Sequence, residues 1–153
     1  MVKKLLKRLS IFLAIVLIGF LAFFFFYANS LSNVNPIAIT YYQTLKKNLK
    51  ANGYKADVFV ISGKRANWHN QLLTYFGAAS KSQHLKGNAI DIVVLDVNDD
   101  GLYNDKDVDI VTSQLELIIR NKGGVGTYKT ENLLWNRQMV HFDCRGSHAR
   151  WSR

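Results

Sequence analysis

A chain of 153 residues has room for one compact domain and a short appendage, but not for two domains. Its formal net charge of +9 suits an anionic membrane surface, an anionic polymer or nucleic acid. The basic residues do not form one long stripe interleaved with aromatic residues, so we expect no nucleic-acid partner. Cys144 is the only cysteine, which excludes an internal disulfide and a cysteine-based metal cluster.

The N-terminal segment has the pattern of a membrane anchor. A basic segment at residues 1–10 precedes an apolar run at residues 11–28 that contains no charge and no proline. A helix with a rise of about 1.5 Å per residue would just cross a bilayer core of about 30 Å over that length. Because positive charge marks the inner side, the basic segment is predicted to be cytoplasmic and the remaining chain to lie outside.

A cleaved signal peptide is the alternative, because Ala28-Asn29-Ser30 offers small residues at a plausible cleavage site. An uncleaved transmembrane signal-anchor is favoured, since the apolar run exceeds the usual length of about 7–15 residues and ends in bulky Phe23-Phe24-Phe25-Phe26-Tyr27. Residues 29–35 then form a short polar linker, and the domain occupies residues 36–153. We therefore expect a single-pass protein of the cytoplasmic membrane with its domain on the periplasmic or extracellular side.

The domain mixes helices and strands without regular alternation, which predicts the α+β class with a small mixed or antiparallel sheet and flanking helices. Apolar spacing predicts helices at 36–52, 67–76 and 107–120, and strands at 57–62, 89–95, 124–128 and 139–144. For the last helix, the residues available for a buried face are Val108, Ile110, Val111, Leu115, Leu117 and Ile118.

Two of the strands carry metal-type ligands on the face that does not form the core. The even-numbered positions of the strand at 89–95 are apolar, so Asp91 points away from the core, toward whatever His84 in the preceding turn faces. On the last strand, His141 and Asp143 likewise lie opposite the apolar face. Each residue taken singly is more often a surface or hydrogen-bonded residue. Together, two histidines and one carboxylate give the three-ligand arrangement of catalytic zinc, with a fourth position for water.

The residues around these ligands resemble a known superfamily. The stretch from Ser82 to Asp91 reads S-x-H-x-x-G-x-A-x-D, and the strand at 140–143 reads V-H-x-D. This combination resembles the zinc D-Ala-D-Ala carboxypeptidase and hedgehog-type peptidase superfamily, and most of all its murein endopeptidase-like branch with a V-H-x-D ending. The resemblance covers roughly Pro36 to Trp151. Further similar features are Ser62-Gly63-Lys64-Arg65, which parallels S-G-Y-R, Asn70, the glycine-rich stretch 123–128 and Arg150-Trp151.

The resemblance implies a zinc metallopeptidase with zinc on His84, Asp91 and His141. Its substrates would be the peptide stems or cross-links of bacterial peptidoglycan, cut by a carboxypeptidase or an endopeptidase. It also implies that Arg65 faces the substrate, where a guanidinium can hold a carboxylate or stabilise an oxyanion. A structural ion pair is the alternative role for Arg65. A non-catalytic cell-wall-binding protein of the same fold is the alternative function.

The general base of this chain is not where many relatives place it. They carry a histidine two positions, or an acidic residue three positions, before the last ligand, and here those positions hold Met139 and Gln138. Asp143 shares a strand face with His141 and is the candidate for proton transfer. Its alternative role is to orient the zinc-bound histidine.

Residues 96–107 fit the twelve-residue calcium loop, with Gly101 at the sharp turn of position 6. The loop resembles that of dockerin modules, but only one copy is present. We therefore expect a structural calcium ion inside the peptidase domain rather than a docking module. An Asx-rich turn without an ion is the alternative. The predicted calcium ligands are Asp96, Asn98, Asp100, the Leu102 carbonyl, Asn104 and Asp107.

Overall fold

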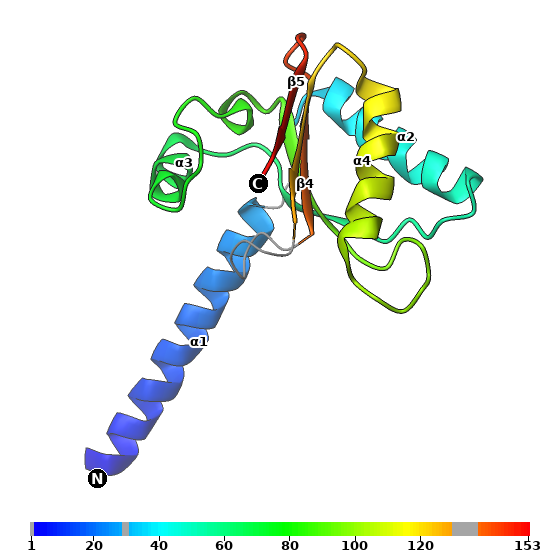
Figure 1. Ribbon diagram of the computed structural model, residues 1–153. Coiled ribbons are helices and arrows are strands. Elements are labelled where there is room, and N and C mark those ends of the chain that lie inside the picture. The colour runs from blue at the N-terminus through cyan, green and yellow to red at the C-terminus, as the bar shows by residue number, and fades with distance from the viewer. Residues whose placement is uncertain (1, 29–30, 130–137) are drawn as a thin grey trace.

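The computed structural model describes residues 2–28, 31–129 and 138–153. Its first element is a long helix, α1 (Val2–Ala28), which extends away from the rest of the chain (Figure 1). Within the described chain, its window Leu6–Phe23 is the one span long and apolar enough to cross a membrane, with a mean hydropathy of 2.2. The helix begins before the predicted span because the lysine, arginine and leucine residues there are good helix formers.

A five-stranded sheet forms the centre of the domain, with the strand order β1-β2-β4-β3-β5. The strands are β1 (Val58–Ser62), β2 (Ala89–Val94), β3 (Gly124–Tyr128), β4 (Met139–Asp143) and β5 (Ala149–Ser152). Neighbouring strands are antiparallel except β3 and β5, which are parallel. The predicted α+β class with a mixed sheet is confirmed. Strand β5 is absent from the predicted elements, because its four residues contain no apolar run that would predict a strand.

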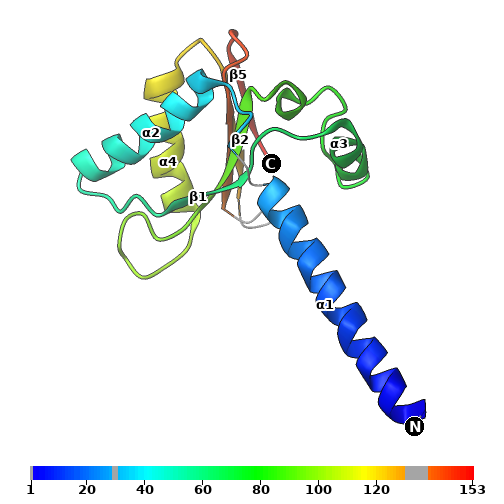
Figure 2. The ribbon, with the colours of Figure 1, turned by 180° about the vertical axis from the view of Figure 1, so that it is seen from behind.

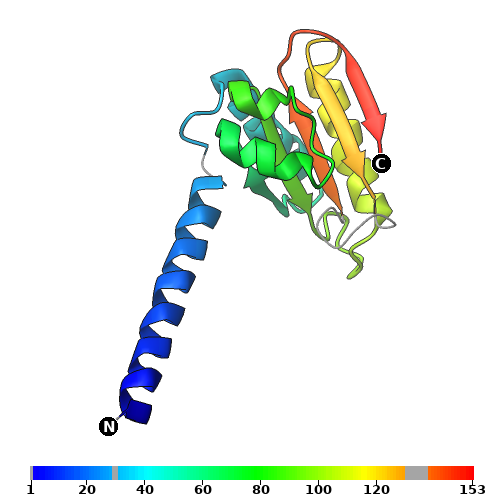
Figure 3. The ribbon, with the colours of Figure 1, turned by 90° about the vertical axis from the view of Figure 1, so that its left-hand side faces the viewer.

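Helices flank the sheet on both sides. One layer consists of α2 (Pro36–Ala51) and α4 (Asp105–Ile119). On the other side lie α3 (Asn67–Thr74) and the short 3-10 helix η1 (Gln83–Lys86) (Figures 1 and 2). Figure 3 shows the α3 side in front of the sheet. The two helical layers thus divide the domain into a core side and a side on which polar residues of the sheet face α3 and η1.

The hydrophobic core lies between the sheet and the α2–α4 layer. On α4, Leu117 is 66% exposed, which corrects its predicted place on the buried face, while Ile110 and Ile118 are partly buried against the core. Leu117 follows the buried Leu115 by two residues, which is about 200° around a helix, so it lies on the opposite side. The buried stripe of α4 consists of Val108, Val111, Leu115 and Ile119.

Strand register places the predicted ligands next to each other. Ile90 and Ile92 of β2 and Phe142 of β4 are fully buried in the core. Because side chains alternate along a strand, the residues between them face the α3–η1 side. Asp91 and His141 are direct partners in the antiparallel β2–β4 ladder, so their side chains lie side by side on that face.

Candidate metal centre

Three buried side chains from three different elements meet on the α3–η1 side of the sheet. His84 comes from η1, Asp91 from β2 and His141 from β4. The His84 Nε2 atom lies 3.1 Å from Asp91 Oδ1 and 3.2 Å from His141 Nδ1, and the last two atoms are 2.7 Å apart. Among the described histidine, cysteine, aspartate and glutamate residues, these three form the group whose ligand atoms lie within 4.8 Å of one another.

The position of His84 is set by the turn before β2. The Ser82 side chain accepts a hydrogen bond from the His84 backbone N–H at 3.3 Å and caps η1. Gly87 ends η1 with φ +72°, a conformation that favours glycine, and a Cβ there would lie 2.5 Å from the Asn33 carbonyl oxygen. The motif S-x-H-x-x-G therefore forms a tight turn that places His84 next to Asp91 on β2.

The hydrogen bonds of the two histidines direct one lone pair of each toward Asp91. The Nδ1 atom of His84 lies 2.6 Å from the Gly63 carbonyl oxygen, which can only accept, so Nδ1–H is the donor and Nε2 holds a lone pair. The Nε2 atom of His141 lies 3.2 Å from Asp143 Oδ2, which leaves the lone pair of its Nδ1 facing Asp91. With both rings neutral, two imidazole lone pairs and a carboxylate oxygen form a set of acceptors that can bind a cation between them. The donor set therefore fits a zinc ion.

Electrostatics in the same group also favour a bound cation. Burial lowers the pKa of His84 and outweighs the nearby Asp91 charge, so its neutral form is favoured. Burial opposes the charge of Asp91, but the two histidines hold the pKa of its carboxyl well below the ordinary value. Burial also acts to lower the pKa of His141, yet its hydrogen bonds to Asp143 and Asp91 raise the pKa. A proton or a metal ion is thus attracted to the space that the three residues share.

Asp143 lies behind His141 and is fully buried. Its Oδ1 accepts hydrogen bonds from the backbone N–H groups of Gly124 and Arg145 at 3.0 Å each, and the Arg145 guanidinium bonds to both oxygens. Burial acts to raise the pKa of Asp143, but the bonds from His141 and Arg145 lower it far below the ordinary range. Asp143 is not among the described residues that line the pocket beside the candidate ligands. Its carboxylate contacts His141 Nε2, whereas Asp91 contacts Nδ1 of the same ring.

Arg65 forms the ion pair that was the alternative to a substrate contact. Its Nη2 donates to Asp91 Oδ2, and its Nε donates to Ser62 Oγ at 2.9 Å. The Arg65 backbone N–H also donates to the His84 carbonyl at 3.0 Å. The Arg65 side chain nevertheless lines the pocket, so the same guanidinium both holds a candidate ligand and borders the space for a substrate.

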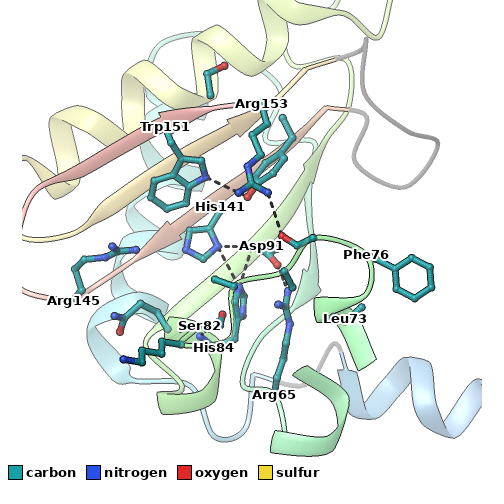
Figure 4. A pocket seen from close by; sticks show the side chains of 17 residues that line it. Arg65, Leu73, Phe76, Ser82, His84, Asp91, His141, Arg145, Trp151 and Arg153 are labelled. Atoms are coloured by element: carbon teal, nitrogen blue, oxygen red, sulfur yellow. Dashed lines mark hydrogen bonds and ion pairs between the residues drawn. The ribbon is translucent and has the colours of Figure 1, made fainter. Parts of the chain in front are cut away.

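The candidate ligands lie in a pocket of about 710 Å³ (Figure 4). Trp151 on β5 packs beside His141, with 5.1 Å between ring centroids, and its Nε1 donates to the Tyr128 hydroxyl at 3.2 Å. Gly126 makes room for this ring, since a Cβ there would lie 2.1 Å from Trp151 Cε2. Most of the pocket wall lies outside the predicted site residues, because it comes from separate parts of the chain. Its basic and aromatic residues are Arg65, Phe76, Lys81, Tyr128, Arg145, Trp151 and Arg153.

The loop predicted to bind calcium is closed by hydrogen bonds to its own backbone. Asp96 accepts from the N–H groups of Asp100 and Gly101 at 3.0 Å each, and Gly101 has φ +79°, as a sharp turn requires. Asp107 is buried, and its carboxylate accepts from three backbone N–H groups, which include that of Asn104 in a capping box at the start of α4. Over the described chain, the loop carboxylates do not form a three-ligand group. Calcium binding therefore stays a prediction.

Comparison with known proteins agrees with this fold. The chain is similar to the solved structure of the L-Ala D-Glu endopeptidase ChiX of Serratia marcescens, with a TM-score of 0.51 and 16% identity. The match covers 74% of this chain and 82% of that chain. This likeness shows the fold alone, which is of the α+β class.

Sequence comparison then identifies the family. The family described as peptidoglycan L,D-endopeptidase MepK matches residues 27–151, which is more than half of the chain. The protein therefore belongs to the peptidoglycan L,D-endopeptidase MepK family. No curated protein matches the chain. The predicted resemblance to the murein endopeptidase branch of the zinc peptidase superfamily is confirmed.

Proposed function

We propose that this protein is a zinc-dependent endopeptidase that hydrolyses L,D peptide bonds in bacterial peptidoglycan. The observation that carries the proposal is the convergence of three acceptor atoms, His84 Nε2, Asp91 Oδ1 and His141 Nδ1, at the wall of a pocket. When bound there, zinc supplies a coordinated water of lowered pKa and polarises a carbonyl. The family description favours endopeptidase action over the carboxypeptidase action that the sequence also allowed.

The protein's own residues supply orientation and charge. Arg65 is held by Ser62 and Asp91 and borders the pocket, so its guanidinium is placed to donate to a substrate carboxylate or to a developing oxyanion. In our proposal, Asp143 orients His141 and keeps its Nε2 protonated, rather than moving a proton itself. Lys81 and Arg153 also line the pocket and give it the positive charge that suits the carboxylates of peptide stems.

We further propose that α1 anchors the protein in the cytoplasmic membrane with the domain outside. The length and hydropathy of the window Leu6–Phe23 support an anchor. The basic residues at its N-terminal side support an orientation in which residues 1–10 are cytoplasmic. This location would place the pocket in the compartment that contains peptidoglycan.

We propose separately that residues 96–107 bind calcium. The side chains of Asp96, Asn98 and Asp100 turn inward around Gly101, which supports it. Ligation by Asp107 would require its carboxylate to exchange backbone hydrogen bonds for the ion.

The zinc proposal is tested with the full-length protein in detergent. Zinc content is measured by elemental mass spectrometry, and hydrolysis is measured on cross-linked muropeptides with and without a chelator. We expect one zinc ion per chain and chelator-sensitive cleavage, both lost in His84→Ala. The matched control is His148→Ala, because His148 is exposed. A zinc-loaded protein that cleaves no muropeptide would support the non-catalytic wall-binding function instead, and absence of zinc after reconstitution would refute the site.

A further inference from the structure

The α3 side of the domain carries a cluster of exposed apolar side chains outside the metal centre. Trp68, Leu72, Tyr75 and Phe76 are 54%, 49%, 85% and 73% exposed. Their spacing of four, seven and eight residues places them on one side of α3 and the turn that follows it. His69 and Asn70 of the same helix are buried. We call these four exposed residues the α3 apolar face.

Charge is unevenly distributed around this face. From residue 58 to residue 90 the chain contains four basic residues, of which Arg65 is paired with Asp91, and no acidic residue. The acidic residues concentrate instead in the loop and helix start at residues 96–109, which contain six aspartates. Figures 1 and 2 show that loop and α4 on the opposite side of the sheet from α3. The α3 apolar face therefore lies on the basic side of the domain. An anionic surface attracts this positive charge.

The connection between α1 and the domain is short and enters on the same side. Only five residues separate the end of α1 at Ala28 from Val34, which is buried in the core. The six residue steps from Ala28 to Val34 span at most about 20 Å when fully extended. The Asn35 backbone N–H donates to the Gly87 carbonyl at 2.8 Å, so the entering chain is fixed to the end of η1. Figures 1 and 2 show the end of α1 on the α3 side of the sheet.

We propose that the α3 apolar face docks on the surface of an anionic phospholipid bilayer, the same bilayer that α1 spans. This inference rests on the proposed membrane anchoring. Tryptophan and tyrosine are the side chains that favour the membrane–water interface, and adjacent basic residues are attracted to anionic headgroups. Leu73 and Phe76 also line the pocket, so docking fixes the orientation of the pocket relative to the membrane. The enzyme would then act on peptides close to the membrane surface.

The test uses the full-length protein reconstituted in vesicles of phosphatidylcholine and phosphatidylglycerol, with bromine on the acyl chains next to the headgroup. Bromine quenches tryptophan emission on contact. The Trp68 component of the emission is obtained as the difference between the wild type and Trp68→Phe. We expect this component to be quenched, and to lose its quenching when Leu72→Ser and Tyr75→Ser are combined. We also expect weaker quenching when phosphatidylcholine replaces phosphatidylglycerol.

The matched control is Leu117→Ser, because Leu117 is exposed on the opposite helical layer; it should leave the quenching unchanged. Circular dichroism of each variant verifies that the fold is kept. If the protein floats with the vesicles but Trp68 is not quenched, docking is refuted and the anchor stands. If the protein does not float with the vesicles, the anchor and docking are both refuted. A Trp68 component that responds to soluble muropeptides and not to bromine would assign the α3 apolar face to the substrate and refute docking.

Discussion

At the scale of single residues, the orientation of His141 follows from the groups on either side of its ring. Nδ1 faces Asp91 at 2.7 Å and Nε2 faces Asp143 at 3.2 Å. Asp143 is in turn fixed by Arg145 and by the Gly124 backbone N–H. This chain of contacts means that a change at Asp143 should reach the metal through His141, although Asp143 is not itself a proposed ligand.

Asp143→Asn tests that connection, because it keeps the side-chain volume and removes the charge. We expect zinc affinity to fall by about 10–100-fold, since the imidazole loses its charged partner. Competition with a fluorescent zinc chelator measures the affinity. The control is Asp109→Asn, which removes an exposed carboxylate that pairs with Lys129 on the surface. Equal zinc affinity in the wild type and Asp143→Asn would show that Asp143 does not orient the ligand.

Arg65→Lys tests the two roles of the Arg65 guanidinium. Lysine keeps the positive charge but cannot reproduce the forked contacts to Ser62 and Asp91. We expect kcat/KM on muropeptides to fall by about 100-fold or more, as for the loss of an oxyanion donor, with zinc content unchanged. The neighbouring Lys64→Ala is the control. Loss of zinc in Arg65→Lys would instead assign Arg65 to holding Asp91 alone.

At the scale of elements, β5 forms the wall of the pocket through its pairing with β3. The Trp151 ring lies directly over Gly126, with which it pairs in the parallel ladder, and packs beside His141. The Arg145 guanidinium lies 5.5 Å from the same ring. Packing of β5 therefore contributes both to the shape of the pocket and to the position of a candidate ligand.

Gly126→Ala should disrupt this wall, because the new Cβ would overlap the Trp151 ring. We expect the free energy of unfolding to fall by about 1–3 kcal/mol, the usual cost of overpacking, together with a loss of activity. Chemical denaturation of the zinc-loaded protein measures the change. In a Trp151→Ala background the same substitution should cost much less, since the overlapping ring is gone. Equal costs in both backgrounds would mean that the ring does not set the requirement for glycine.

The loop at 96–107 connects β2, which carries Asp91, to α4. If the loop binds calcium, the ion stabilises the native state by mass action, and the thermal midpoint rises with calcium concentration. We expect that rise for the wild type and its loss in Asp100→Asn. Differential scanning calorimetry at a series of calcium concentrations measures it. An unchanged midpoint with calcium and with a calcium chelator would identify the loop as an Asx-rich turn that needs no ion.

At the scale of the whole molecule, an apolar helix and a basic domain are joined by a very short connection. With α1 in the bilayer, the protein should stay in the membrane fraction through high-salt and alkaline washes. Protease added to spheroplasts should digest the domain if it lies outside. Replacement of Leu13 and Leu17 by arginine should release the protein from the membrane, because charge at the bilayer centre is costly. Protection of the domain in spheroplasts, with digestion only after lysis, would reverse the proposed orientation.

The sequence by itself determined the features that depend on local periodicity. Alternation along the strands correctly placed Ile90 and Phe142 in the core, and Asp91 and His141 on the opposite face, because the period of two is a property of any extended chain. The motif around His84 likewise predicted a turn, because Ser82 and Gly87 act on residues close in the sequence.

Only the tertiary structure decided what the site residues contact. The pairing of Arg65 with Asp91, the burial of Asp143 against Arg145, and the wall formed by Trp151 all depend on how β5, β4 and the β1–α3 connection pack together. These contacts join residues with no fixed spacing in the sequence, so no local pattern predicts them. The physical reason is that periodicity fixes the face on which a side chain lies, whereas register and packing fix its partner.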